Sequence, residues 1–142
     1  MTRAIRGYHL ADLYEEAIAL VMSLAPPGLT ERWGVCKFDG FPDFRLNLGR
    51  YRVIGVIPQK TRVDIFMEWR KVFQNRQFYE QEPDFLQFED AFGALEIQDW
   101  NTPWHIATSE VLHGPYVEQF LRSGMALIVR ELNRRHPAKG TK

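Results

Sequence analysis

The sequence predicts an α+β fold in which an antiparallel β-meander packs against helices from the two ends of the chain. Apolar residues recur at helical spacing near both ends, over residues 8–25 and 117–134. Between them, residues 32–67 form short alternating segments, with no stretch long enough for a parallel crossover connection. A chain of 142 residues has the length of a single domain. We therefore expect one α+β domain over residues 1–136 and a flexible C-terminal tail at residues 137–142.

The helix expected at residues 8–25 has an apolar face and an acidic face, and a Pro-Pro-Gly run ends it. Pro115 is well placed near the start of the closing helix. A shorter helix is expected at residues 83–92 and a short strand at 104–107. The apolar positions that define the long helices are Leu10, Leu13, Tyr14, Ala17, Ile18, Val21 and Leu24, and then Val117, Phe120, Leu121, Gly124, Met125, Ile128 and Leu132.

Four strands are predicted in the central region, at residues 32–38, 43–48, 51–57 and 61–67. Gly49-Arg50 fits a two-residue hairpin loop with glycine first, so Leu48 should oppose Tyr51. A loop with an odd number of residues, Pro58–Lys60, would then gather the apolar side chains on one face. That face is expected to carry Phe44, Leu46, Leu48, Tyr51, Val53, Ile57, Val63, Ile65 and Met67. The opposite, mixed face is expected to carry Arg45, Asn47, Arg52, Ile54, Val56, Arg62, Asp64 and Phe66.

Charge is balanced over the chain but segregated along it. Eighteen basic residues match eighteen acidic ones, so the net charge predicts neither a nucleic-acid partner nor an anionic membrane. Residues 32–76 contain ten Lys or Arg and four acids, whereas residues 77–100 contain seven acids and no Lys or Arg. We expect the acidic segment to lie across the basic sheet within one fold. An exposed basic face and a charge match between subunits remain alternatives.

Several functional classes lack support in the sequence. The motifs of nucleotide-binding loops and of the serine nucleophile elbow are absent, and the four histidines match no zinc signature. The single cysteine cannot form an internal disulfide. Early acidic residues argue against a secretory signal, and no apolar run approaches the length of a membrane span. We therefore expect a bacterial cytoplasmic protein without cofactor or bound metal.

Tryptophans provide the most suggestive functional pattern. Trp33, Trp69, Trp100 and Trp104 could line an apolar pocket together with polar orienting groups, although closing the edges of the core is the simpler role for them. The predicted ligand-binding residues are Arg45, Arg52, Phe66, Trp69, Trp100, Trp104 and His105.

Two alternative functions use other residues. A small enzyme would place an acid–base site at His105, Glu110 and His113. A nucleic-acid binder would use a basic sheet face made by Arg45, Arg50, Arg52, Lys60 and Arg62. The leading expectation is a non-catalytic module that binds a small molecule or a protein. A homodimer is left open, and nucleic acid is the less favoured partner.

Three stretches of the sequence resemble a known family. ERWGVCKFDG is similar to its first strand, RYRVIGVIPQKTRVDIFMEW to its central strands, and PWHIATSEVLHGPYVEQFLRSGMALI to its closing strand and helix. These stretches resemble the YdhG-like bacterial domains of largely unknown function. The resemblance implies a small α+β domain with a curved antiparallel sheet. Some members are described as iron chaperones, but no ligand cluster in this sequence carries that role over.

Overall fold

The protein is a single α+β domain, as the sequence predicts. The computed structural model describes residues 2–38, 41–97 and 103–136. Its strands form one antiparallel sheet in the order β1-β2-β3-β4-β5. The elements are α1 (Thr2–Leu24), β1 (Thr30–Phe38), β2 (Phe41–Leu48), β3 (Tyr51–Pro58), β4 (Val63–Met67), α2 (Trp69–Gln74), the 3-10 helix η1 (Arg76–Phe78), α3 (Pro83–Ala94), β5 (Trp104–Ile106), α4 (Ser109–Leu112) and α5 (Val117–Arg135). The predicted tail, residues 137–142, lies outside the described residues.

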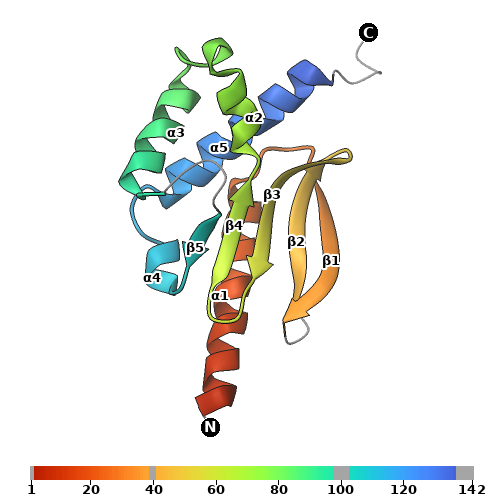
Figure 1. Ribbon diagram of the computed structural model, residues 1–142, viewed down its shortest axis with the longest axis vertical. Helices are drawn as coiled ribbons and strands as arrows, with labels where there is room; N and C mark the ends of the chain where they lie inside the picture. Colours follow the sequence, from red (N-terminus) through yellow and green to blue (C-terminus); the bar gives the residue numbers. More distant parts are fainter. Residues whose placement is uncertain (1, 39–40, 98–102, 137–142) are drawn as a thin grey trace.

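The long helices cover one side of the sheet. In Figure 1, α1 runs behind the strands, and no described helix crosses in front of them. Helix α5 contacts α1 and strand β3, while α2 and α3 pack on α5 beyond the end of the sheet. We call the helix-covered side the inner face and the opposite side the outer face.

A β-bulge decides which residues of β3 enter the core. Leu48 opposes Tyr51 around the predicted Gly49-Arg50 turn, which confirms that hairpin. The register then shifts, and the consecutive residues Val53 and Ile54 are both fully buried. A bulge places two residues opposite one, so the alternation reverses beyond it. Ile54 and Val56 therefore lie on the inner face, whereas Ile57, opposite Asp64, lies on the outer face, so the predicted places of these three residues were wrong.

The next loop reverses the alternation a second time. Pro58 pairs with Val63, so residues 59–62 form an even loop instead of the predicted odd one. The backbone N–H of Gln59 donates to the carbonyl of Arg62 at 2.8 Å and closes this loop. Because the bulge and the even loop compensate for each other, the apolar side chains of β4 still reach the core. Those buried residues are Val63, Ile65 and Met67.

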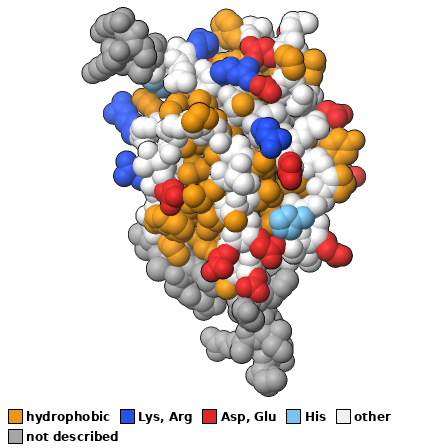
Figure 2. Space-filling view, turned by 180° about the vertical axis from the view of Figure 1, so that it is seen from behind, with side chains coloured by type: hydrophobic (Ala, Val, Ile, Leu, Met, Phe, Trp, Pro, Cys, Tyr) orange, Lys and Arg blue, Asp and Glu red, His pale blue; other side chains and the backbone are white. Residues whose placement is uncertain are grey.

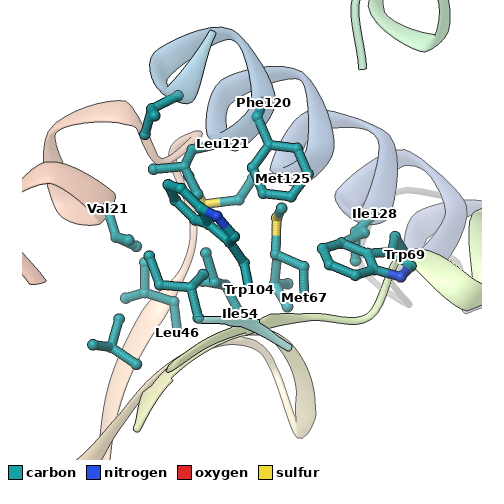
Figure 3. Packing of buried hydrophobic residues seen from close by; sticks show 14 of the residues in the cluster. Val21, Leu46, Ile54, Met67, Trp69, Trp104, Phe120, Leu121, Met125 and Ile128 are labelled. Atoms are coloured by element: carbon teal, nitrogen blue, oxygen red, sulfur yellow. The ribbon is translucent and has the colours of Figure 1, made fainter. Parts of the chain in front are cut away.

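The core lies between the inner face and the long helices (Figure 3). Ile54 and Met67 from the sheet face Phe120, Met125 and Ile128 of α5, as the sticks in Figure 3 show. Burial of this apolar surface provides the main favourable term in folding. An aromatic group extends the core towards α3 and comprises Trp69, Phe73, Phe85, Phe88, Phe92 and Phe120.

The acidic segment does not lie across the sheet, so that prediction was wrong for its described residues. Helix α3 packs on α5, where Arg130 bonds to both Glu82 and Asp84. Arg76 pairs with Glu80 and with Glu89, at 3.3 and 3.5 Å. These acids are matched by arginines of the helical layer, which leaves the outer face uncovered by them.

Candidate functional site

The outer face brings together four of the predicted ligand-binding residues. Arg45 opposes Gly55, which in turn opposes Phe66 on the next strand. His105 lies one row away, opposite Asp64. The guanidinium of Arg52 sits 4.7 Å from the centre of the Phe66 ring. Arg45, Arg52, Phe66 and His105 therefore share one side of the sheet.

Gly55 keeps the middle of this face low. A Cβ atom at this position would lie 3.8 Å from Cδ of Arg52 and 4.0 Å from Cγ of Arg45. The missing side chain thus leaves a shallow space between the two arginine stems. A larger side chain at position 55 would itself occupy that space.

Arg52 is held in place by a carboxylate and an aromatic ring. Its Nε and Nη2 atoms donate to the same oxygen of Glu68, at 3.1 and 2.8 Å. Phe66 supports the flat guanidinium from below, an arrangement that favours arginine over lysine. A restrained arginine loses less side-chain entropy when it binds a ligand than a freely rotating one.

A buried carboxylate organises the other half of the outer face. Asp64 is 3% exposed, yet it accepts three hydrogen bonds. Nε of Arg62 donates at 2.9 Å, Nε2 of Gln59 at 3.2 Å and Nδ1 of His105 at 2.6 Å. With Nδ1–H on the carboxylate, Nε2 of His105 is the ring nitrogen directed away from Asp64. The imidazole is 44% exposed, so this ordered polar group is accessible.

Unsatisfied acceptors flank Arg45 on β2. Oδ1 of Asp43 and Oδ1 of Asn47 are buried and have no hydrogen-bond partner within the described structure. Both residues lie two positions from Arg45, so all three belong to the same face of the strand. Asp43 also makes a loose ion pair with Arg45, at 3.7 Å. A buried acceptor without a donor lowers the stability of the folded state.

The predicted tryptophans do not join this face. Trp104 precedes His105 on β5, so the two side chains point to opposite sides of the sheet. Trp104 and Trp69 are 6% and 1% exposed and pack against Phe120 in the core. The predicted grouping of these two residues with the arginines was therefore wrong. Trp100 lies outside the described residues.

Trp33 does remain exposed, on the helix side of the molecule. It opposes Phe44 and contacts that ring edge-on at 4.9 Å, so it belongs to the inner face. Its exposed fraction is 53%, and that of Met22 on α1 is 44%. Seen from behind, hydrophobic side chains gather on this helix side (Figure 2).

The residues of the alternative enzyme site are not assembled into one group. His105 bonds to Asp64 on the outer face, whereas Nε2 of His113 lies 3.2 Å from Glu16 of α1. Ser109 donates to the same Glu16 oxygen at 2.6 Å. Glu110 is exposed on α4. Among the described residues, no three or more His, Cys, Asp or Glu side chains form a group that could hold a metal ion.

The basic residues proposed for nucleic acid are also divided. Three of them pair with acids on or beside the outer face, as Arg45–Asp43, Arg52–Glu68 and Arg62–Asp64. Arg50 and Lys60 are exposed in the turns at opposite ends of β3. This pairing makes the outer face nearly neutral instead of strongly basic.

Two cavities lie away from the outer face. One, of about 340 Å³, is formed where the His113–Tyr116 loop enters α5, beside Leu20. The other, of about 480 Å³, lies beside α3 and is lined by Phe73, Leu86, Glu89, Asp90, Phe92 and Gly93. Among the described residues, no predicted ligand-binding residue lines either cavity.

Sequence reasoning missed the Asp64–His105 pair, although it placed Asp64 on the mixed face. The two residues are 41 positions apart, and only the β4–β5 register joins them. The available signal for this pair was one polar residue, Asp64 or His105, within each of two otherwise apolar strands. No local spacing could show that these two strands are neighbours.

Comparison with known proteins identifies no relative. No protein-family model matches the chain, and no curated protein or solved structure does so. Within residues 2–38, 41–97 and 103–136, no helix has the length and hydropathy required to span a membrane.

Proposed function

We propose that the chain is a non-catalytic, cytoplasmic binding module whose outer face docks a protein partner. The observation that carries this proposal is the open outer face itself, which presents ordered polar groups and which none of the described helices covers (Figure 1). The restrained Arg52, the anchored His105 and the partly buried Phe66 offer directional contacts around a shallow centre. Arginine and aromatic residues are enriched where proteins bind one another.

Charge and shape support a protein partner in preference to nucleic acid. The paired arginines leave little net positive charge for a phosphate backbone to neutralise. A broad strand surface also suits a protein better than a small molecule, which needs an enclosing pocket.

Site-specific photo-crosslinking in the native cell tests this proposal. A benzophenone amino acid at position 45 should give a discrete adduct, and Arg52→Ala should reduce it. The matched control places the same probe at position 122, an exposed arginine on α5. Equal adducts at both positions, or none from position 45, would refute the proposal. A third probe at position 33 tests the exposed Trp33 of the inner face, and a dominant adduct from it would move the interface there.

The Asp64–His105 hydrogen bond favours a second candidate, a small hydrolytic enzyme. A carboxylate that orients an imidazole can support general-base catalysis by the opposite ring nitrogen. Hydrolysis of activated esters such as p-nitrophenyl acetate is a simple assay. On this alternative, His105→Gln abolishes hydrolysis above background and His113→Gln preserves it. Equal rates for both variants would exclude His105 as the base.

A further inference from the structure

Three separate chain segments bring basic groups around the ring of Tyr51, at the end of the β2–β3 hairpin. Arg50 in the turn places its guanidinium 5.4 Å from the ring centre. Lys71 of α2 places its ammonium group 5.6 Å from the same centre. His136 at the end of α5 stacks on the ring at 4.2 Å and an angle of 11°. The hairpin turn, α2 and the end of α5 meet in the upper part of Figure 1.

Polar contacts add a hydroxyl to this cluster. Arg50 Nη2 donates to the Tyr51 hydroxyl oxygen at 3.3 Å, and Nδ1 of His136 lies 3.4 Å from it. Arg50 and His136 are exposed, and Tyr51 and Lys71 are half-buried. The groups are therefore both ordered by mutual contact and accessible to a ligand. We refer to Arg50, Tyr51, Lys71 and His136 as the Tyr51 cluster.

No acid neutralises the cations of this cluster within the described part of the chain. Neither Arg50 nor Lys71 forms an ion pair there. Glu131 on α5 is fully buried and already binds both Arg134 and Arg135. These three side chains together therefore keep one net positive charge. Like charges gathered without a counter-ion repel one another, and a bound anion would remove that repulsion.

Ordinary structural roles account for only part of the arrangement. Cations in the last turn of a helix complement its dipole, which explains Arg134 and Arg135. The dipole of α5 does not explain the positions of Arg50 in a β-turn and of Lys71 in a different helix. A cation–π contact with Tyr51 needs one cation, yet the fold places two beside the same ring.

We propose that the Tyr51 cluster is a phosphate-binding site. Arginine offers a planar fork of N–H donors and lysine a compact charge, and the two together are well suited to phosphate oxygens. The Tyr51 hydroxyl supplies a third donor beside them. The ligand is a free phosphate or the phosphate group of a mononucleotide. This site is distinct from the outer face and does not depend on the function proposed for it.

Calorimetric titration at low ionic strength tests the site with inorganic phosphate, adenosine monophosphate and adenosine as probes. Phosphate and the nucleotide should bind, and adenosine should not. Affinity should fall as salt is added, because the contact is exposed and electrostatic. Similar affinities for phosphate and nucleotide identify free phosphate as sufficient. Much tighter binding of the nucleotide identifies the nucleotide as the ligand.

Variants distinguish phosphate binding at the Tyr51 cluster from nonspecific attraction to positive charge on the surface. The double variant Arg50→Ala/Lys71→Ala should weaken binding by roughly tenfold or more, because two charge-assisted contacts are lost. Arg122→Ala removes an exposed arginine elsewhere on α5 and should leave affinity unchanged. Thermal unfolding of each variant checks that it is folded. Absence of phosphate binding, or an equal loss of affinity in the Arg122→Ala control, would overturn the proposal.

Discussion

Replacing Glu131 by glutamine should destabilise the protein more than any other removal of a single charge described above. Glu131 is completely buried on α5, and four side chains donate to its carboxylate. Tyr79 and Asn75 each donate at 2.8 Å from the segment that follows α2. Arg134 and Arg135 donate at distances of 2.6 to 3.0 Å. The carboxylate therefore fastens the α2–η1 region to the end of α5.

The expected loss follows from the pKa of this group. Burial alone would raise the pKa of the Glu131 carboxyl, but hydrogen bonds from Arg134, Tyr79 and Arg135 outweigh it and lower the pKa from 4.5 to about 2. A shift of this size corresponds to about 3 kcal/mol in favour of the folded state when the group is ionised. Burial, together with the neighbouring Glu131 carboxylate, also raises the pKa of Tyr79 to about 12. Glutamine keeps the shape but places an NH₂ group among donors, so Glu131→Gln should cost about 3 kcal/mol at pH 7.

The sign of the pH dependence follows from the direction of that shift. Because the folded pKa lies below the unfolded one, the stabilisation is complete above pH 4.5 and is lost as pH falls towards 2. Urea unfolding of the wild type and Glu131→Gln at several pH values measures both quantities. The difference between the two proteins should be largest at neutral pH and should shrink between pH 4.5 and 2.

The matched control is Glu118→Gln, an exposed acid on the same helix. Its effect should stay within about 0.5 kcal/mol at neutral pH, as for most surface substitutions. A difference between wild type and Glu131→Gln that did not change with pH would refute the assigned role of the ionised carboxylate. A cost for Glu131→Gln no larger than that for Glu118→Gln would refute the buried network.

Further predictions concern three glycines. A Cβ at Gly124 would lie 2.8 Å from Phe88 and 3.0 Å from Met67, so Gly124→Ala should lower the free energy of unfolding by about 1–3 kcal/mol in urea titrations. A Cβ at Gly93 in α3 would meet no atom of the described residues within 4 Å, so Gly93→Ala should be neutral or stabilising by up to about 1 kcal/mol, and an equal loss in both variants would contradict the packing argument. Gly55→Ala makes only ordinary contacts and should leave thermal stability nearly unchanged, yet it should reduce the crosslink from position 45. Loss of folding in that variant would show that this position is structural instead.

Local sequence patterns determined the elements that depend on neighbouring residues. Helical spacing predicted the two long helices, although α1 begins at Thr2, earlier than its apolar pattern does. Alternation and turn chemistry predicted the meander, and Gly49 does adopt a positive φ of 61° in the hairpin turn. The arginines and His105 were expected near one ligand surface, and four of the predicted residues do share the outer face. The helices, the meander and the hairpin turn follow from interactions within a few residues, whereas the place of His105 on the outer face also needed the pairing of β4 with β5.

Tertiary structure decided the features that depend on distant partners. The bulge at Val53 moved Ile54 and Val56 into the core, because burying them gains more than the lost ladder bonding costs. Glu82 and Asp84 pair with Arg130 on α5 and not with the arginines of the sheet, because short-range ion pairs depend on which elements pack together. Trp104 entered the core because its partner across the sheet is the buried Ile65. Spacing along the chain determines periodicity and turns, whereas the identity of each side chain's neighbours is set only when the whole chain folds.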